Sequence, residues 1–342
     1  MATLPRRHLL AAAPAALLAA CEPGMRLTAS NTPKVDQAGL QRAVSDLAAS
    51  AAPATLGVAL MNLESGETFA FNGDRPFPMQ SVFKLPLGAA ALAEADAGRL
   101  NLDERVTLQP EQLSAPRSPI GEAWPARRDF SWRELLVSAL TVSDNTAADV
   151  LMKRIGGPGA VTAWLQGRRV PAIRVDRYER ELQPDVYGMP SFRPQWRTGA
   201  AFSAAKAAVP PERRMQAMRA YLADPRDTAT PNGMLEFLNM LNREELVSPA
   251  STQLLLRILF ESPSTPNRIR AGLPPGARVA HKSGSSGSDQ GLTPATNDVG
   301  IIVLRDRRAY ALAVFLAGST AEEPAREALI AQVTRATVRA VG

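Results

Sequence analysis

Two residue types that build many catalytic sites are nearly absent from this chain of 342 residues. The single cysteine, Cys21, excludes an intrachain disulfide framework and a cysteine-rich zinc site. The two histidines, His8 and His281, leave little material for a histidine metal site or a Ser-His-Asp triad. We therefore expect no metal and no cofactor, and a serine nucleophile in this chain would need a lysine or a carboxylate as its base.

Hydrophobic runs long enough to span a membrane are missing as well. The apolar run after Arg6 and Arg7 is too short to cross a bilayer, and it fits a secretory signal peptide over residues 1–20. Its end, Leu18-Ala19-Ala20-Cys21, resembles the bacterial lipobox, in which the cysteine is lipidated; the alternative is an ordinary cleaved signal with a chance cysteine. The arginine pair also resembles a twin-arginine signal. We expect export to the periplasm or cell envelope, with a lipid anchor at Cys21 as the only membrane attachment.

A broad excess of one charge is also absent. The formal net charge is +6, and removal of Arg6 and Arg7 with the signal leaves +4. Residues 186–220 alone carry +5, so the rest of the mature chain is close to −1. Because a nucleic-acid-binding protein needs a broad basic face, we expect no nucleic-acid partner.

Hydrophobic patterning predicts strands near both ends of the chain and helices between them. Two runs flank Glu64-Ser65-Gly66 and predict a β-hairpin, and Asp306-Arg307-Arg308 joins two later runs closely enough for a second one. Ser319 or Thr320 is expected to cap a final helix. The five predicted strands cover residues 56–61, 67–71, 278–282, 299–304 and 310–315.

This order suggests one sheet that both chain termini build, beside a separate helical lobe. We expect a site in the cleft between the two lobes, where sites commonly lie. The predicted parts are a tether at residues 21–35, an α/β lobe at 36–76 and 265–342, and a helical lobe at 77–264 with an insertion at about 186–220.

Four short signals that carry chemistry follow one another along the chain. S-x-x-K alone is weak, since the unrelated segment Ser203-Ala204-Ala205-Lys206 also fits it. Only the ordered set is specific. The four are S-x-x-K at Ser81-Val82-Phe83-Lys84, S-D-N at Ser143-Asp144-Asn145, an acidic segment around Glu179, and K-S-G at Lys282-Ser283-Gly284.

The first signal places a base beside a nucleophile. A serine hydroxyl attacks poorly at neutral pH unless a base lies within hydrogen-bond reach. Three residues apart on a helix, Ser81 and Lys84 share one face, so the amine can approach the hydroxyl. Near the helix N-terminus, the positive end of the dipole favours developing negative charge. To act as a base Lys84 must be partly neutral, which requires a pKa lowered by burial or by nearby cations.

Two further signals can serve proton transfer and substrate binding. Ser143 precedes an apparent helix, where its hydroxyl suits a proton shuttle between the lysines and a leaving nitrogen. The alternative is an ordinary N-cap serine. Lys282, at the end of a predicted strand, can present a cation to a substrate carboxylate; otherwise it is an exposed strand-end lysine.

From about Leu40 to the C-terminus the chain resembles the class A serine β-lactamases, whose signature is this ordered set. The resemblance implies an α/β (α+β) fold of the β-lactamase/transpeptidase type, with an antiparallel sheet, flanking helices and an all-helical lobe. It implies a monomer that takes β-lactam antibiotics: Ser81 is acylated, and a water that Glu179 activates hydrolyses the ester. Whether Lys84 or Glu179 takes the serine proton stays open. Substrate binding falls to Asn145, Lys282, Ser283 and Ser285, with oxyanion-hole N–H groups from Ser81 and Ser285.

Several positions depart from the family pattern. Gln183 and Asp149 stand where the family usually has asparagines that help hold the water and the catalytic Glu179. Two ionised carboxylates in contact repel each other, so Asp149 and Glu179 either share a proton or the Glu179 loop is rearranged. Arg268 resembles an alternative position of the arginine that binds the substrate carboxylate; otherwise it is a surface arginine. The glutamine before Ser81, together with Asp149, indicates a divergent branch of the family.

A long insertion follows Glu179. From there to the family-like Asp227 the chain is roughly 35 residues longer than the family pattern, and the excess coincides with the basic segment 186–220. The favoured interpretation is a self-packed surface insertion. The alternative is a basic, aromatic lid that selects anionic substrates or a cell-envelope polymer. Its four aromatic residues are Tyr187, Phe192, Trp196 and Phe202.

Two other functions fit parts of the pattern. One is a penicillin-binding-protein-like D-Ala-D-Ala peptidase or esterase that uses Ser81 without efficient deacylation. Glu179 argues against it, because such a peptidase needs no carboxylate there. The other is a non-catalytic lipoprotein that binds cell-wall material through a degenerate site. Four intact site residues argue against it: Ser81, Lys84, Ser143 and Lys282.

Overall fold

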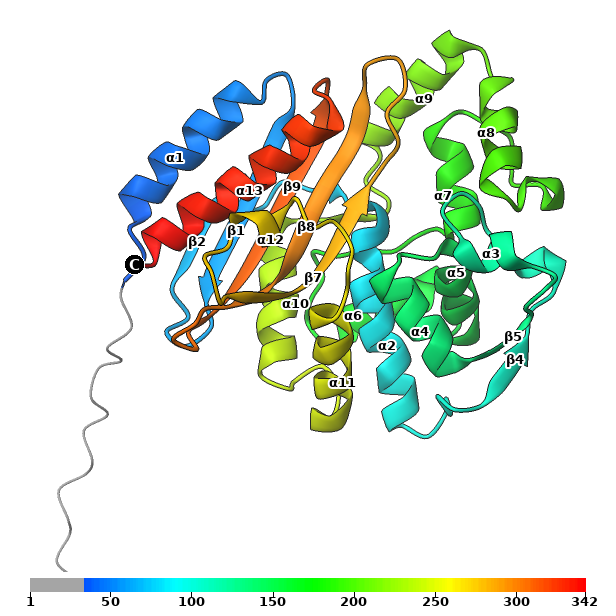
Figure 1. The fold of residues 1–342 in the computed structure, drawn as a ribbon, viewed down its shortest axis with the longest axis horizontal. Helices are drawn as coiled ribbons and strands as arrows, with labels where there is room; N and C mark the ends of the chain where they lie inside the picture. Colours follow the sequence, from blue (N-terminus) through cyan, green and yellow to red (C-terminus); the bar gives the residue numbers. More distant parts are fainter. Residues whose placement is uncertain (1–33) are drawn as a thin grey trace, which may run out of the picture. The chain divides into compact units, whose positions relative to one another are not determined.

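A five-stranded antiparallel sheet forms the centre of residues 34–342, the part of the chain that the computed structural model describes (Figure 1). Its strands are β1 (Thr55–Asn62), β2 (Thr68–Phe71), β7 (Arg278–Ser285), β8 (Thr293–Val303) and β9 (Ala309–Ser319). The strand order is β2-β1-β9-β8-β7, so the β1–β9 pair joins the two early strands to the three late ones in one sheet, as the patterning predicts.

Both predicted hairpins are present. β1 and β2 pair in a register that sets Val58 opposite Phe71. Gly66 in their turn has a φ of 73°, which glycine adopts without a steric penalty. β8 and β9 form the second hairpin, and each reaches eleven residues, longer than predicted. Buried polar residues such as Asn297 interrupt the apolar pattern of β8 without ending the strand.

Two helices from opposite ends of the described chain cover one face of the sheet: α1 (Gln37–Ser50) and α13 (Glu323–Ala340) (Figure 1). Leu40 and Val44, one helical turn apart, are the buried residues of α1. They belong to a hydrophobic cluster with sheet residues such as Val314. The two helices, one from each end of the described residues, therefore form one layer on this face of the sheet.

The capping prediction for the final helix is wrong. α13 begins at Glu323, with Glu322 as its N-cap residue. Ser319 still belongs to β9, so it is not free to begin a helix. Pro324 lies in the first turn of α13, where its fixed φ and missing N–H fit, and this favours the later start.

The opposite face of the sheet shares the main hydrophobic core with the helices. Phe315 and Val299 of the sheet belong to it together with Leu92 of α2 (Lys84–Asp96), and Phe77 stacks on Phe315 with ring centroids 5.7 Å apart. The described residues form one compact unit, and the predicted boundaries between the lobes remain predictions.

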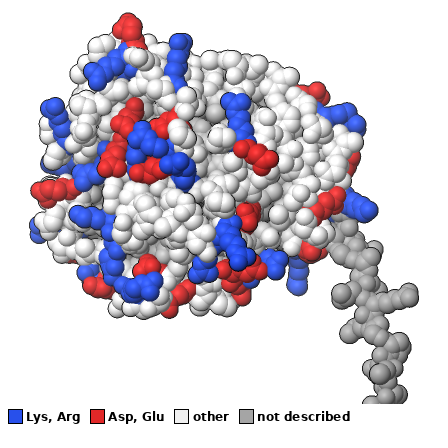
Figure 2. Space-filling model, turned by 180° about the vertical axis from the view of Figure 1, so that it is seen from behind, with Lys and Arg blue, Asp and Glu red and all other residues white. Residues whose placement is uncertain are grey.

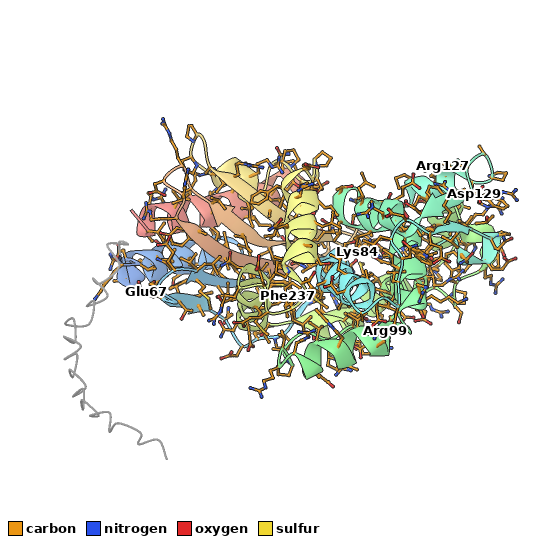
Figure 3. The ribbon with its side chains drawn as sticks, turned by 90° about the horizontal axis from the view of Figure 1, so that it is seen from below. Glu67, Lys84, Arg99, Arg127, Asp129 and Phe237 are labelled. Carbon is orange, nitrogen blue, oxygen red and sulfur yellow. The ribbon has the colours of Figure 1, made fainter. Side chains whose placement is uncertain are left out.

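The remaining elements belong to the helical part, apart from the short helix α12 (Ile269–Gly272), which packs against α13 and β7. Figure 3 shows Lys84 and Phe237 in the interior, whereas Arg127 and Asp129 lie at the outer end of this part. Its longer helices are α4 (Trp132–Thr141), α5 (Asn145–Arg154), α6 (Pro158–Gly167), α7 (Glu179–Val186), α8 (Gly199–Ala207), α9 (Pro211–Ala223), α10 (Pro231–Asn242) and α11 (Pro249–Phe260). The shorter elements are α3 (Pro119–Ala123), the 3-10 turns η1 (Gln80–Phe83), η2 (Pro110–Gln112) and η3 (Pro194–Trp196), and the strand pairs β3 (Phe77–Pro78) with β6 (Thr228–Ala229) and β4 (Arg105–Thr107) with β5 (Asp129–Ser131).

The insertion at residues 186–220 folds as helices. It contains η3, α8 and most of α9, and Figure 1 shows α7, α8 and α9 together at one end of the structure. Tyr187 and Phe202 are buried in a small hydrophobic cluster that also holds Met218 and Tyr221. Most buried members of this cluster belong to the insertion, which favours the self-packed interpretation, and Ala115 and Leu182 join the cluster from outside it.

The surface carries mixed charge. Figure 2 shows basic and acidic side chains interspersed over the face that it displays. Within residues 34–342, no helix has the length and apolar character needed to cross a bilayer. The predicted signal peptide, Cys21 and most of the tether lie outside the described residues.

Candidate active site

The predicted nucleophile and its lysine lie in contact. Ser81 belongs to the 3-10 turn η1, and Lys84 is the first residue of α2, where the sequence predicts a single helix from Ser81. Residues three apart eclipse each other in a 3-10 turn, and Lys84 Nζ lies 3.0 Å from Ser81 Oγ. Lys84 is fully buried, whereas Ser81 is 8% exposed, so only the serine is open to the cleft.

The Lys84 amine is held by several oxygen atoms. It donates to the backbone oxygen of Ser143 at 2.8 Å and to Oδ1 of Asn145 at 2.5 Å. It also forms an ion pair with Glu179, with 2.9 Å between Nζ and Oε1. The amide nitrogen of Asn145 donates to the backbone oxygen of Pro116 at 2.7 Å, which fixes the amide orientation. These contacts hold the Lys84 amine beside the Ser81 hydroxyl.

Glu179, the first residue of α7, is fully buried and reaches the nucleophile. The Ser81 hydroxyl donates to Oε1 of Glu179 at 3.4 Å. Gln183, one turn further along α7, donates its amide to Oε2 of Glu179 at 2.8 Å and to Oε1 of Gln80 at 3.1 Å. Gln80 in turn donates to the Tyr221 hydroxyl at 2.9 Å. The longer amide of Gln183 thus reaches the catalytic carboxylate, and the glutamine before Ser81 is its second partner.

Asp149 holds the backbone of the Glu179 segment, whereas the resemblance leads one to expect contact with the carboxylate. Its side chain accepts from the N–H of Glu179 at 2.7 Å and from the N–H of Arg180 at 3.1 Å. The Ser114 hydroxyl donates to it at 2.6 Å. Burial, and secondarily the charge of Glu179, raises the pKa of Asp149 to about 7, although these hydrogen bonds oppose the rise. The contacts of Asp149 are thus with the backbone N–H groups of Glu179 and Arg180.

Ser143 lies between the two lysines. Lys84 Nζ is 3.3 Å from its hydroxyl oxygen, and Lys282 Nζ donates to the same oxygen at 3.1 Å. Asp144, and not Ser143, caps α5, since its side chain accepts from the N–H of Ala147. Lys282 is fully buried, and burial together with the charge of Lys84 holds its pKa well below the usual lysine value.

A glycine lets strand β7 approach the nucleophile. A Cβ at Gly284 would lie 2.3 Å from the backbone oxygen of Met79 and 3.0 Å from the backbone nitrogen of Val82. Only glycine therefore allows β7 to lie directly against η1. This packing brings Ser283 and Ser285, on either side of Gly284, to the edge of the cleft.

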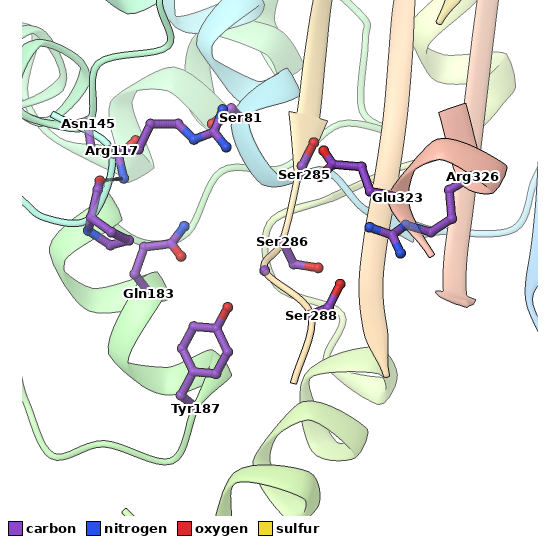
Figure 4. A pocket seen from close by; sticks show the side chains of 12 residues that line it. Ser81, Arg117, Asn145, Gln183, Tyr187, Ser285, Ser286, Ser288, Glu323 and Arg326 are labelled. Carbon is purple, nitrogen blue, oxygen red and sulfur yellow. Dashed lines mark hydrogen bonds between the residues drawn. The ribbon is translucent and has the colours of Figure 1, made fainter. Parts of the chain in front are cut away.

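The cleft has a volume of about 370 Å³, and its wall includes Ser81, Asn145 and Gln183 on the helical side and Ser285 on the sheet side (Figure 4). A smaller hollow of about 230 Å³ shares Ser81 and Ser285 with it and extends to Ser143 and Ser283. Among residues 34–342, no three His, Cys, Asp or Glu side chains are grouped so as to hold a metal ion. The site therefore combines a serine, two buried lysines and a buried carboxylate around one opening.

Comparison with known proteins agrees with this geometry. Residues 39–341 match the model of a family described as the beta-lactamase enzyme family. The chain belongs to this family. Among the curated proteins similar to this chain, the β-lactamase VEB-1 of Pseudomonas aeruginosa is 29% identical over 83% of the chain and 84% of its own length. PER-1 of the same organism is 31% identical over 82% and 81%, respectively.

Solved structures extend the likeness to the fold. A β-lactamase from Chitinophaga pinensis has a TM-score of 0.74 and 33% identity, covering 89% of this chain and 99% of its own. An ancestral class A β-lactamase reconstructed for Gram-negative bacteria has a TM-score of 0.72 and 34% identity, covering 88% and 99%. The fold of this family member is therefore the predicted α/β, β-lactamase/transpeptidase-like one.

Arg268 of this β-lactamase family member is not a surface residue. Only 1% of it is exposed. Its guanidinium donates to Ser285 Oγ at 2.8 Å and to the backbone oxygen of Asn297 at 3.0 Å, and it pairs with Glu327 at 3.1 Å. The cation therefore lies directly behind Ser285 of the cleft wall, and Arg268 itself does not line either hollow.

Three charged residues of the cleft were not predicted from the sequence. Arg117, Glu323 and Arg326 line it (Figure 4). Arg117 directly precedes Ser118-Pro119, which resembles a further short segment of the class A family and was a usable signal. Arg326 lies on α13 far along the chain, donates to Thr296 Oγ1 at 3.0 Å, and belongs to no motif that could have marked it.

Proposed function

We propose that this protein hydrolyses the β-lactam amide through an acyl-enzyme on Ser81, which a water activated by Glu179 then cleaves. One observation carries the proposal: Ser81 Oγ lies 3.0 Å from Lys84 Nζ and 3.4 Å from Glu179 Oε1, so both candidate bases are within reach of one hydroxyl. VEB-1, PER-1 and the L2 enzyme of Stenotrophomonas maltophilia, each named a β-lactamase, support the same activity.

Acylation begins when Ser81 gives its hydroxyl proton to the Lys84–Glu179 pair and Oγ bonds to the lactam carbonyl carbon. Because Nζ and Oε1 of this pair are 2.9 Å apart, a proton that one group accepts can pass to the other. The N–H groups of Ser81 and Ser285 stabilise the oxyanion, an effect worth about 3–4 kcal/mol per donor in other enzymes. The carbon–nitrogen bond then breaks.

The leaving nitrogen takes its proton from Ser143. This hydroxyl lies within hydrogen-bond distance of both buried lysines, so either can restore its proton. In the empty cleft, burial and the charge of Lys84 lower the pKa of Lys282. A bound substrate carboxylate would raise that pKa again and favour the charged form, which couples substrate binding to the proton supply.

Deacylation uses the other side of the site. Glu179 accepts a proton from a water molecule whose oxygen attacks the Ser81 ester, and the proton returns to Ser81 Oγ as it leaves. Gln183 holds Oε2 of Glu179 at 2.8 Å, which leaves Oε1 directed at the nucleophile. A peptidase that forms a lasting acyl-enzyme would not need this buried carboxylate, so its placement favours the hydrolase.

The test is hydrolysis of nitrocefin by three purified proteins. We expect turnover by the wild type and a loss of at least about 10³-fold in Ser81→Ala. Ser203→Ala is the matched control, because Ser203 heads the second S-x-x-K segment but is exposed on α8, and it should keep full activity. Turnover by Ser81→Ala at the wild-type rate would contradict the proposal.

We also propose that the protein is exported to the periplasm or cell envelope and anchored by a lipid on Cys21, and that it acts as a monomer. The lipobox-like segment supports the anchor, and a cleft completed within one chain supports the monomer. Labelled palmitate should enter the wild type and not Cys21→Ser. Absence of label from the wild type would favour an ordinary cleaved signal, and a dimer mass in light scattering would contradict the monomer.

A further inference from the structure

Tyr221 of α9 belongs to none of the motifs that mark the site, yet its hydroxyl reaches the residue before the nucleophile. The residue is 4% exposed and packs in the hydrophobic cluster that also holds Met218 and Leu182. The guanidinium of Arg177 lies 5.8 Å from the centroid of its ring. Because α9 lies mostly within the insertion, a segment that the family pattern lacks fixes the position of this hydroxyl.

The Tyr221 hydroxyl binds the side chain of Gln80, which directly precedes Ser81. It accepts a hydrogen bond from Nε2 of Gln80 at 2.9 Å, across 141 positions of the chain. Gln80 is only 1% exposed, and among residues 34–342 no other acceptor meets this amide nitrogen. A buried amide N–H without an acceptor is unfavourable, so the tyrosine hydroxyl stabilises this orientation of Gln80.

The hydrogen bonds between Glu179 and Tyr221 have one possible polarity. Nε2 of Gln183 donates to Oε2 of Glu179 at 2.8 Å and to Oε1 of Gln80 at 3.1 Å. Gln183 must present its nitrogen to the carboxylate, because an ionised carboxylate only accepts. Gln80 therefore presents its oxygen to Gln183 and its nitrogen to Tyr221. If the Gln80 amide turned over, two NH2 groups would face each other.

This series of hydrogen bonds begins at the carboxylate that the proposed deacylation uses. Oε1 of Glu179 lies 2.9 Å from Lys84 Nζ and 3.4 Å from Ser81 Oγ. Within the described part of the chain, Gln183 is the only hydrogen-bond donor to Oε2. A shift of Gln80 would take an acceptor from Gln183 and free its amide to turn away from Oε2. The carboxylate could then rotate, and Oε1 would lose its fixed orientation toward the nucleophile.

We propose that Tyr221 is a positioning residue for deacylation. Its hydroxyl holds Gln80, which in turn supports the amide of Gln183. That amide keeps Glu179 oriented toward the water that attacks the ester. The insertion thereby contributes to hydrolysis through one hydroxyl that lines neither hollow of the site. The inference rests on the proposed function, because it concerns one step of that reaction.

Tyr221→Phe in the full-length protein is the direct test, because it keeps the packed ring and removes only the hydroxyl. Quenched-flow mass spectrometry follows the rise and decay of the benzylpenicillin adduct on Ser81 in a single turnover and gives both rate constants. We expect deacylation to slow by about 3- to 10-fold, whereas acylation changes by less than about 2-fold. In steady state kcat and KM should fall together, with kcat/KM preserved.

A double variant tests whether Tyr221 acts through Gln80. Once Gln80→Ala has removed the amide that the hydroxyl binds, adding Tyr221→Phe should slow deacylation no further.

Tyr310→Phe is the matched control, because it removes another buried tyrosine hydroxyl, which accepts from Arg308 at 3.2 Å. Tyr310 of β9 belongs to the hydrophobic cluster on the face of the sheet that α1 and α13 cover. Both rate constants should therefore stay unchanged in this variant.

An unchanged deacylation rate in Tyr221→Phe would overturn the inference. A further slowing in the double variant would show that the hydroxyl acts by another route, and an equal slowing in Tyr310→Phe would indicate general loosening; either result also contradicts it. Partial unfolding of a variant cannot imitate the expected result, because decay of the adduct is first order in molecules that are already acylated. Formation and loss of the adduct in the wild type test the proposed function independently of Tyr221.

Discussion

At the scale of single residues, two glutamines act together. Gln183 bridges Glu179 and Gln80, with donor–acceptor distances of 2.8 and 3.1 Å. A shorter asparagine could not span the same gap from the same backbone position. Gln80 and Gln183, which both depart from the family pattern, therefore act together to orient Glu179.

Removing the bridge should slow deacylation and spare acylation. We expect Gln183→Ala to lower kcat by about 10- to 100-fold and to lower KM in parallel, since a slower second step accumulates the acyl-enzyme. Stopped-flow measurement of nitrocefin should show a burst close to one equivalent of enzyme. Gln80→Ala leaves the Gln183–Glu179 contact intact and should cost less. A fall in kcat/KM equal to that in kcat, without a burst, would contradict the assigned role.

The raised pKa of Asp149 predicts a pH-dependent stability. The folded protein binds this proton more tightly than the unfolded chain, whose aspartate has its ordinary pKa near 4. The stabilising contribution of the proton is complete below about pH 4 and is lost as the pH rises to about 7. In urea unfolding, the wild type should lose stability relative to Asp149→Asn across this range and run parallel to it at higher pH. Parallel curves throughout would contradict the prediction.

The sequence predicted a site made of five residues, and the structure brings them together: Ser81, Lys84, Ser143, Glu179 and Lys282. The sequence did not reveal what Asp149 binds. Whether its carboxylate meets the side chain or the backbone of Glu179 depends on the loop conformation, which contacts distant along the chain determine.

At the scale of elements, the site depends on the close approach of β7 to η1. Gly284 leaves no room for a side chain there, and Asn297 of β8 donates to the backbone oxygens of Pro78 and Met79 at 2.9 and 3.1 Å. These contacts hold the sheet against the segment that contains η1, and they fix the position of Ser285 relative to Ser81.

Gly284→Ala should separate these two elements. The new methyl group would lie 2.3 Å from the backbone oxygen of Met79, so β7 or η1 must move. We expect a loss of stability of about 1–3 kcal/mol and a fall of about 100-fold or more in the acylation rate. Gly159→Ala on α6 is the control, since no atom lies within 4 Å of its Cβ position. Full acylation by Gly284→Ala would contradict the role of the close packing.

The strands were more predictable than the helix starts. Alternating or continuous apolar runs bounded by turn residues located all five strands of the central sheet. Ser81 instead lies on a separate 3-10 turn before α2. The local sequence does not predict a 3-10 turn at Ser81. The turn packs against Gly284, a residue distant along the chain, and this contact contributes to its geometry.

At the scale of the whole molecule, a buried ion pair links the two ends of the segment that carries the insertion. Arg177 and Asp227 lie 2.6 Å apart and are only 5% and 1% exposed in their side chains. Asp224 adds a second carboxylate, 3.3 Å from the guanidinium. The two ends of the segment that carries the insertion therefore meet at one ion-pair cluster.

Breaking this pair should affect the entire segment. Arg177→Ala leaves the buried carboxylate of Asp227 without its cation, so we expect a destabilisation of about 3–5 kcal/mol, read as a lower midpoint in thermal unfolding. Arg243→Ala removes an exposed pair with Glu245 and should change stability by less than about 1 kcal/mol. Equal effects of the two substitutions would contradict the structural role of Arg177.

The contacts of the insertion could not be predicted from the sequence. Its length, charge and aromatic content were visible in the sequence, and they fitted both a packed insertion and a lid. Its contacts with the β7–β8 loop join residues about 75 positions apart, such as Arg214 and Asp289, and no local pattern encodes such a pairing.

The central claim, that Ser81 is acylated and Glu179 drives its release, is tested most directly by intact-protein mass spectrometry of Glu179→Gln mixed with benzylpenicillin. The account predicts an adduct of the full penicillin mass on the peptide that contains Ser81, persisting long after the wild type has returned to its free mass. A variant that forms no adduct and leaves the drug intact, or one that turns over as fast as the wild type, would contradict it.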